Sequence, residues 1–153
     1  MKELNDILKT DKALPLSKKT ILNIFFVQSQ FKDELQSVLK PFDLSMEQFN
    51  VLRILRGQRG KPINLQDIQE RMVNKMSNTT RLVDKLILKE LVERFTCEKN
   101  RRKVEIFITE KGLEQLQELD KLIDDSEVEL TNNLSASELE HLNQLLNKLR
   151  TQT

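Results

Sequence analysis

A short polar segment of the chain carries residue types that can read nucleic-acid bases. Lys75, Ser77, Asn78, Thr79 and Arg81 fall within a seven-residue span at the start of a predicted helix. Asn pairs with adenine edges in the major groove, Arg pairs with guanine edges, and Ser and Thr reach phosphates. The same residue types are also common at helix starts, where they cap free backbone N–H groups. The segment therefore fits either a DNA-reading edge or an ordinary helix start.

A second cluster of cations follows between two segments rich in Val, Ile, Phe and Thr. Residues 92–97 and 104–109 are β-prone and flank six polar residues, 98–103, which predicts a β-hairpin. The predicted loop holds four cations, which are Lys99, Arg101, Arg102 and Lys103. Arg inserts favourably where a minor groove narrows and its negative potential rises. The pattern predicts a hairpin tip that contacts the DNA backbone or minor groove.

Charge is distributed unevenly along the chain, although the formal net charge is only +1. Residues 71–103 contain ten Lys and Arg against four Asp and Glu, a net +6, and residues 104–153 contain four against eleven, a net −7. A basic block suits a polyanion because neutralising phosphates releases condensed counterions. A solvated charged face is the alternative interpretation of the same block.

Composition excludes several classes of protein. The chain has 153 residues, about one average domain, with three Gly and three Pro, as expected of a helix-rich globular protein. One Cys, Cys97, and one His, His141, argue against a metal site, and no Gly-rich phosphate loop or catalytic arrangement is present. No apolar stretch is long enough for a membrane span or signal peptide. We expect a cytoplasmic protein that is not an enzyme and needs no cofactor.

The helices that would position these clusters follow from apolar spacing and capping residues. Residues 1–15 form an arm or a short helix, and Ser17 caps a long helix that Pro41 ends. Ser45 with Gln48 forms a capping box for a helix that reaches Gly57. Two more helices are predicted near the C-terminus. Their caps are Thr109 and Ser135, the second with Glu138 as its capping-box partner, and the first helix ends near 132–133.

The central helices form a predicted helix-turn-helix. Asn64 caps the first helix, with Leu65, Ile68 and Met72 on its inner stripe, and residues 73–74 make the turn. The second helix covers residues 75–89. Its inward-facing positions are Met76, Thr79 or Thr80, Leu82, Val83, Leu86 and Ile87. The fold class is therefore mainly α with a small β-hairpin.

These motifs resemble the MarR-type winged helix-turn-helix transcription factors. The resemblance is most specific in residues 74–86, 100–102 and 108–112, and it extends over about 17–150. Four residues depart from the usual pattern, and one of them is Ile108, which stands where the family has Leu. Gln69 replaces a small residue of the first helix of the helix-turn-helix, Glu90 replaces the Gly that ends the second, and Asn100 replaces the acidic wing residue.

The resemblance implies one MarR-like domain over residues 1–153. Dimerisation helices would cover about 17–42 and 109–150, and a winged helix-turn-helix module would cover about 45–108. It implies a homodimer on a pseudo-palindromic operator, because paired copies place two recognition helices about one DNA turn apart. It also implies a small aromatic or anionic effector, whose pocket would lie near Phe25, Ser29, Phe49 and Arg53.

We therefore predict a sequence-specific, double-stranded DNA-binding regulator, acting as a ligand-responsive repressor. Its DNA-binding residues would be Asn64, Lys75, Ser77, Asn78, Thr79, Arg81, Lys99, Arg101, Arg102 and Lys103. The main alternative is a winged-helix protein-interaction module without specific DNA binding. A helical adaptor that uses its leucine stripes to bind another protein's helix is a further alternative.

Overall fold

The computed structural model describes residues 3–97 and 100–151. Within these residues the chain is mainly helical and has one two-stranded antiparallel sheet, as the sequence predicts. In chain order the elements are α1 (Leu4–Leu8), α2 (Leu16–Leu39), the 3-10 helix η1 (Lys40–Phe42), α3 (Met46–Gly57), α4 (Leu65–Arg71), α5 (Thr79–Leu88), β1 (Val92–Cys97), β2 (Asn100–Ile108), α6 (Glu110–Thr131) and α7 (Ala136–Arg150).

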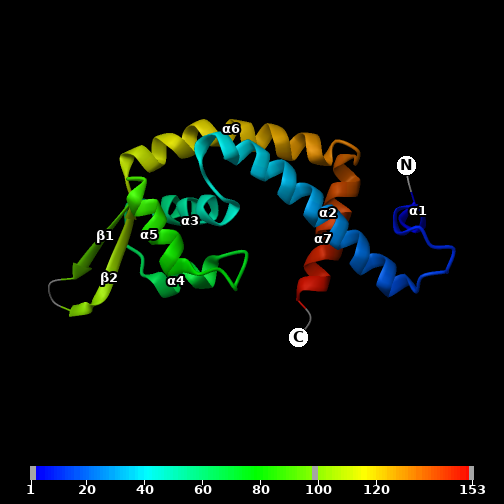
Figure 1. The fold of residues 1–153 in the computed structure, drawn as a ribbon, viewed down its shortest axis with the longest axis horizontal. Coiled ribbons are helices and arrows are strands. Elements are labelled where there is room, and N and C mark those ends of the chain that lie inside the picture. The colour runs from blue at the N-terminus through cyan, green and yellow to red at the C-terminus, as the bar shows by residue number, and fades with distance from the viewer. Residues whose placement is uncertain (1–2, 98–99, 152–153) are drawn as a thin grey trace.

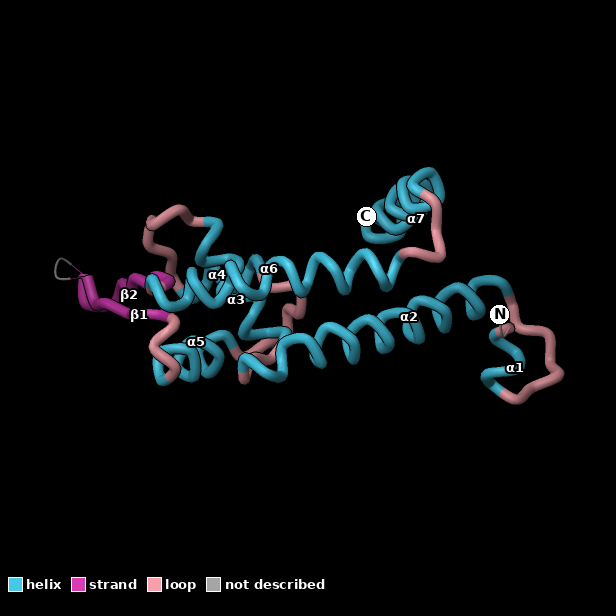
Figure 2. Tube along the Cα trace, turned by 90° about the horizontal axis from the view of Figure 1, so that it is seen from above, coloured by secondary structure: helices cyan, strands magenta, loops and turns pink. Residues whose placement is uncertain are grey.

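The elements form two regions at opposite ends of the molecule. Helices α3, α4 and α5 gather beside the hairpin at one end (Figure 1). The two long helices α2 and α6 run side by side from there (Figure 2) toward α1 and α7 at the other end. We call residues 45–108 the winged-helix module. The long helices connect this module to the end that contains both termini.

Local capping explains where most helices begin. Ser45 and Gln48 make the predicted capping box of α3, and Ser135 and Glu138 make that of α7. The side chain of Thr109 accepts a hydrogen bond from the Gly112 N–H and so starts α6. These caps confirm the predicted starts, because each satisfies backbone N–H groups that the first helical turn leaves free. Helix α2 differs, since it begins at Leu16 after Pro15 and not at a Ser17 cap.

A single apolar core holds the winged-helix module together. Leu52 of α3, Ile68 of α4, Leu86 of α5 and Ile106 of β2 are completely buried. Leu116 on the first half of α6 is also completely buried and belongs to the same core. The module therefore packs against the helix that leads away from it.

The hairpin is longer than the sequence predicts. β1 spans Val92–Cys97 as expected, but β2 begins at Asn100, so the six-residue loop over 98–103 is wrong. Thr96 pairs with Val104 in the antiparallel sheet. The register shifts after this pair, and the next residue, Cys97, pairs with Asn100. Backbone pairing of this kind needs no apolar side chains, which is why the polar composition of the segment is misleading.

A third segment pairs with the hairpin, although no sequence pattern reveals it. Ile63 forms a bridge with Ile106. The Ile63 N–H donates to the Ile106 carbonyl with an N···O distance of 3.2 Å, and the Ile106 N–H donates to the Ile63 carbonyl with an N···O distance of 2.9 Å. This bridge fixes the segment before α4 against the hairpin. The hairpin and the helix-turn-helix are thus joined by backbone hydrogen bonds.

Gly112 permits α6 to begin close to the residues that follow α5. A Cβ at this position would collide with the backbone oxygen of Leu91 and lie 2.8 Å from a side-chain carbon of Ile108. Only glycine fits this approach without a shift of the backbone. The closeness places α6 directly beside the base of the hairpin.

Candidate nucleic-acid interface

The helix-turn-helix consists of α4, an irregular segment over residues 72–78, and α5. The predicted second helix over 75–89 is wrong at its start, because α5 begins at Thr79. The Asn74 side chain accepts from the Met76 N–H, and the Asn78 side chain accepts from the Arg81 N–H. These local side-chain bonds compete with helical pairing and delay the helix by four residues.

The later start of α5 changes the surroundings of the predicted base-reading residues. Lys75 is exposed, and its ammonium donates to the backbone carbonyl of Glu70 at the end of α4. The Asn78 side chain caps α5, as the alternative interpretation of this segment requires. Ser77 holds its hydroxyl oxygen in a buried position, without a partner among the described residues. The segment is thus a folded turn and not a helical face.

Thr79 and Arg81 point to different sides of α5. Thr79 is only 5% exposed and donates to the Gln69 side chain, whereas Thr80 and Arg81 are exposed. The prediction that Met76 faces inward is wrong, because it is 92% exposed in the turn. The outward surface at the start of α5 therefore consists of Asn78, Thr80 and Arg81.

Asn64 takes its predicted position as the cap of α4. Its side-chain oxygen accepts from the Asp67 N–H at 2.8 Å, and the residue is half-buried. This bond satisfies one of the free N–H groups of the first helical turn. The amide nitrogen is the part of Asn64 that remains to contact another molecule.

The predicted arginine cluster falls largely on β2. The backbones of Arg101, Arg102 and Lys103 lie in this strand, and Lys99 lies outside the described residues. An ion pair between Arg94 of β1 and Asp84 of α5, at 2.7 Å, ties the hairpin to the second helix of the helix-turn-helix. The hairpin is therefore attached to α5 at its base, and the sequence carries no signal for this attachment.

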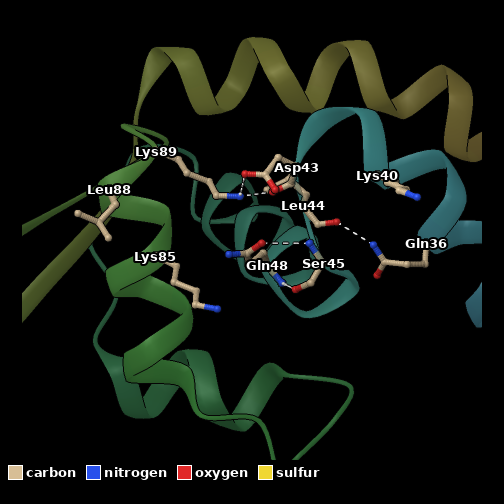
Figure 3. A pocket seen from close by; sticks show the side chains of 9 residues that line it. All are labelled: Gln36, Lys40, Asp43, Leu44, Ser45, Gln48, Lys85, Leu88 and Lys89. Atoms are coloured by element: carbon tan, nitrogen blue, oxygen red, sulfur yellow. Dashed lines mark hydrogen bonds and ion pairs between the residues drawn. The ribbon is translucent and has the colours of Figure 1, made fainter.

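A cluster of lysines lies at the C-terminal end of α5, where this helix meets η1 and the start of α3; we call this place the joint between α5 and η1. Lys85, Lys89 and Lys40 line a cavity of about 530 Å³ there. Figure 3 shows Lys89 reaching Asp43, with 2.8 Å between the ammonium and the carboxylate, while Lys40 points away from them. The hydrogen bond from Lys89 is the main cause that lowers the pKa of Asp43 below its ordinary value of 3.8. This pair fastens the end of α5 to the segment that follows α2.

A larger groove of about 920 Å³ lies between the long helices, the winged-helix module and α7, whose leucines Leu142, Leu145, Leu146 and Leu149 line it. It contains two of the four predicted effector residues, Phe49 and Arg53, and the Arg53 guanidinium lies 5.7 Å from the centre of the Phe49 ring. Phe25 and Ser29 are on α2 but do not line the groove, and Phe25 is 63% exposed. The structure thus brings together only half of the predicted effector site.

Within the described part of the chain, no cluster of His, Cys, Asp and Glu could hold a metal ion. The helices of that part include none that is long and apolar enough to span a membrane.

The α3–α4–α5 arrangement with its hairpin defines a winged helix-turn-helix protein. Residues 44–104 match the MarR family. The multiple antibiotic resistance protein MarR of Escherichia coli is 29% identical over 152 residues, with 97% of this chain and 99% of MarR covered. The regulator TcaR of Staphylococcus aureus (strain Newman) is 27% identical over 114 residues, which cover 73% of this chain and 74% of TcaR.

A solved structure resembles the whole chain. It is a mutant form of E. coli MarR complexed with operator DNA, with a TM-score of 0.76 and 27% identity, and it covers 97% of this chain and 99% of that one. Residues 44–104 thus match the MarR family of winged helix-turn-helix regulators, and nearly the whole chain is similar in sequence and fold to E. coli MarR.

Proposed function

We propose that this protein is a sequence-specific regulator of transcription that binds double-stranded DNA as a homodimer. The observation that supports this most is the outward surface of the helix-turn-helix. Asn78, Thr80 and Arg81 face solvent at the start of α5, beside a hairpin whose backbone carries Arg101 and Arg102. A relative with this fold binds operator DNA in its solved structure.

We assign two kinds of DNA contact to this surface. Arg81 and Asn78 would read or flank base edges in the major groove. Thr79 faces the interior and the Ser77 hydroxyl is buried, so these two predicted residues would shape the helix start and would not contact bases themselves. Phosphates or the minor groove would be bound by the remaining predicted residues, which are Asn64, Lys75, Lys99, Arg101, Arg102 and Lys103. Phosphate contacts supply affinity that falls with salt, and base contacts supply the register.

The homodimer is proposed from apolar faces that have no cover within the described part of the chain. Throughout its length α7 has no buried residue, and Leu142, Leu145, Leu146 and Leu149 are each at least 40% exposed. On α2, Phe25 is 63% exposed. A second copy that covers these faces would place two recognition helices on one pseudo-palindromic site.

We further propose that DNA binding responds to a small aromatic or anionic molecule and that the outcome is repression. The groove beside Phe49 and Arg53 supports the first part, because it combines an aromatic ring with a cation. A ligand there would contact both the long helices and the winged-helix module. The activity is regulatory and not enzymatic, and it takes place in the cytoplasm.

Fluorescence anisotropy tests the DNA-binding proposal directly. Wild-type protein is titrated with the duplex from upstream of its own gene and with random duplex, across salt concentrations. We expect tighter binding to the upstream duplex and weakening by Arg101→Ala/Arg102→Ala, with a salt slope lower by about two because two phosphate contacts are lost. Lys12→Ala/Lys121→Ala removes two exposed cations elsewhere and should leave the binding unchanged.

Absence of binding to either duplex at low salt, in a folded dimer, would contradict this function. A protein-interaction module would then be the better description of the chain.

A further inference from the structure

Met72 is buried at the start of the turn between α4 and α5, but residues 73–78 have little apolar burial to hold them in place. Val73 is 87% exposed and Met76 is 92% exposed, so neither side chain anchors this segment in the core. Exposed backbone with few buried contacts usually opens with a small free-energy cost. The shape of this turn must therefore depend on hydrogen bonds.

The side chain of Gln69 supplies two of those bonds. Gln69 lies on the last turn of α4, and its amide nitrogen donates to the backbone carbonyl of Lys75 at 2.6 Å. Its amide oxygen accepts from the hydroxyl of Thr79, the first residue of α5. One side chain thus links all three parts of the helix-turn-helix.

The surroundings of this link favour a lasting interaction. Gln69 is half-buried and Thr79 is 5% exposed, so water has limited access to the bond between them. Hydrogen bonds that are shielded from water are more costly to break, because the buried groups lose their partners. The Lys75 ammonium adds a bond in the opposite direction, to the carbonyl of Glu70.

The chemistry at this position requires an amide. Only a side chain with both a donor and an acceptor can serve the Lys75 carbonyl and the Thr79 hydroxyl in these directions. Glutamate would keep the acceptor for Thr79 but could not donate to Lys75. Alanine would lose both bonds and leave the Lys75 carbonyl to solvent.

We infer that Gln69 is a positioning residue that sets sequence discrimination in DNA binding by fixing residues 75–78 relative to α5. This inference rests on the proposed DNA-binding function. Base contacts depend on hydrogen-bond geometry, so a displaced turn reduces the preference for the correct sequence. Phosphate contacts depend mainly on charge, so binding to random duplex changes little.

The test measures the ratio of affinities for the upstream and random duplexes. Gln69→Ala should lower this ratio by roughly tenfold, which is within the range of one lost base contact, and leave the salt slope unchanged. Gln66→Ala is the matched control, because Gln66 lies on the same helix and bonds to the exposed side chain of Glu70. It should keep the wild-type ratio.

Variants of Thr79 separate positioning from a general loss of stability. Thr79→Ser keeps the hydroxyl and should retain most of the discrimination, whereas Thr79→Val should reduce it as Gln69→Ala does. The double variant Gln69→Ala/Thr79→Val should be no worse than Gln69→Ala alone, because Thr79 acts on the turn through its bond to Gln69. Additive losses would contradict a shared link.

Amide hydrogen exchange of the free protein provides a readout that does not require DNA. We expect severalfold faster exchange over residues 73–78 in Gln69→Ala, with unchanged exchange in the core of α3. If the wild type selects its duplex and Gln69→Ala keeps both discrimination and exchange, the inference about Gln69 is wrong while the proposed function stands. If the wild type binds no duplex, the proposed function fails together with the discrimination role, and the exchange data alone decide whether Gln69 holds the turn.

Discussion

The winged-helix module and the terminal helices differ in how their apolar residues are covered. In the module, Leu52, Ile68 and Ile106 are completely buried within one chain. On α7, Leu145 and Leu149 are 47% and 46% exposed, although they recur at the spacing of a buried helical face. The module can therefore fold on contacts within its own chain, whereas α7 leaves an apolar face that the second copy of the proposed homodimer would cover.

The largest effect should come from placing charge on the uncovered face. Leu145→Glu/Leu149→Glu should raise the dissociation constant of the dimer by at least about 100-fold, because unpaired charges would be buried in an apolar interface. Analytical ultracentrifugation measures this change, and far-UV circular dichroism checks that the helices persist.

The control for the charged α7 variant is Gln144→Glu/Lys148→Gln, which makes the same net charge change at the polar positions of the same helix. It should remain a dimer. A dimer that tolerates Leu145→Glu/Leu149→Glu would show that these leucines are not at the interface. The exposure of apolar residues on α7 would then not be explained by a second copy.

A smaller effect is expected where the two regions meet. Gly112→Ala should lower the free energy of unfolding by about 1–3 kcal/mol, because the new methyl group would collide with the Leu91 carbonyl. Gly57→Ala, at the end of α3, is the control, because a Cβ there has no neighbour within 4 Å. It should raise the free energy of unfolding by about 0.5–1 kcal/mol through helix propensity. Urea denaturation measures the change in the free energy of unfolding for both variants. Changes of the same sign in the two variants would contradict the close approach of α6 to Leu91.

The smallest effect concerns the joint between α5 and η1. The Lys89 ammonium lowers the pKa of Asp43 in the folded protein, so the pair stabilises the fold above the ordinary pKa of 3.8. This stabilisation is lost as the pH falls below 3.8 through the lowered folded pKa. Asp43→Asn should therefore be less stable than wild type at neutral pH, and the difference should disappear in acid. A difference that is unchanged at about pH 2, by thermal denaturation, would contradict the ion pair.

The elements that sequence reasoning locates correctly are those with local signals. Ser45, Thr109 and Ser135 begin α3, α6 and α7 as predicted, because each cap involves residues only three positions apart. The β-hairpin is also predictable, since its strands are adjacent in sequence. Short-range hydrogen bonding leaves a pattern in the sequence that can be found without the fold.

The wrong predictions have two causes. Some contacts join residues that are distant in the sequence, and some local hydrogen bonds compete with helical pairing. The bridge of Ile63 to Ile106 joins residues 43 positions apart and leaves no periodic pattern. The start of α5 depends on the Gln69 link to Thr79 and on the turn at Asn74, so Met76 faces solvent despite its apolar side chain. Gln69 itself stands out in the sequence only because it departs from the small residue usual in the family. Its two hydrogen bonds could not be found without the fold.

The effector site is predictable only in part for a similar reason. Phe49 and Arg53 lie one turn apart on α3, so their contact follows from helical spacing. The side of α2 that meets the groove could not be determined from its sequence, because apolar residues surround most of that helix. The structure places Val27 and Phe31 at the groove in place of Phe25 and Ser29.

Helix α6 is joined to the module by a paired contact, since both terminal nitrogens of Arg56 on α3 bond to the Asp120 carboxylate at 2.7 Å and 3.0 Å. At 22 residues, α6 is roughly 33 Å long and can act as a lever arm. A tilt of about 5° at one end of such an arm moves the other end by about 3 Å, close to the roughly 3.4 Å rise of one base pair. In the proposed homodimer, small angular adjustments between the two copies would therefore shift the DNA-binding ends by about one base-pair step.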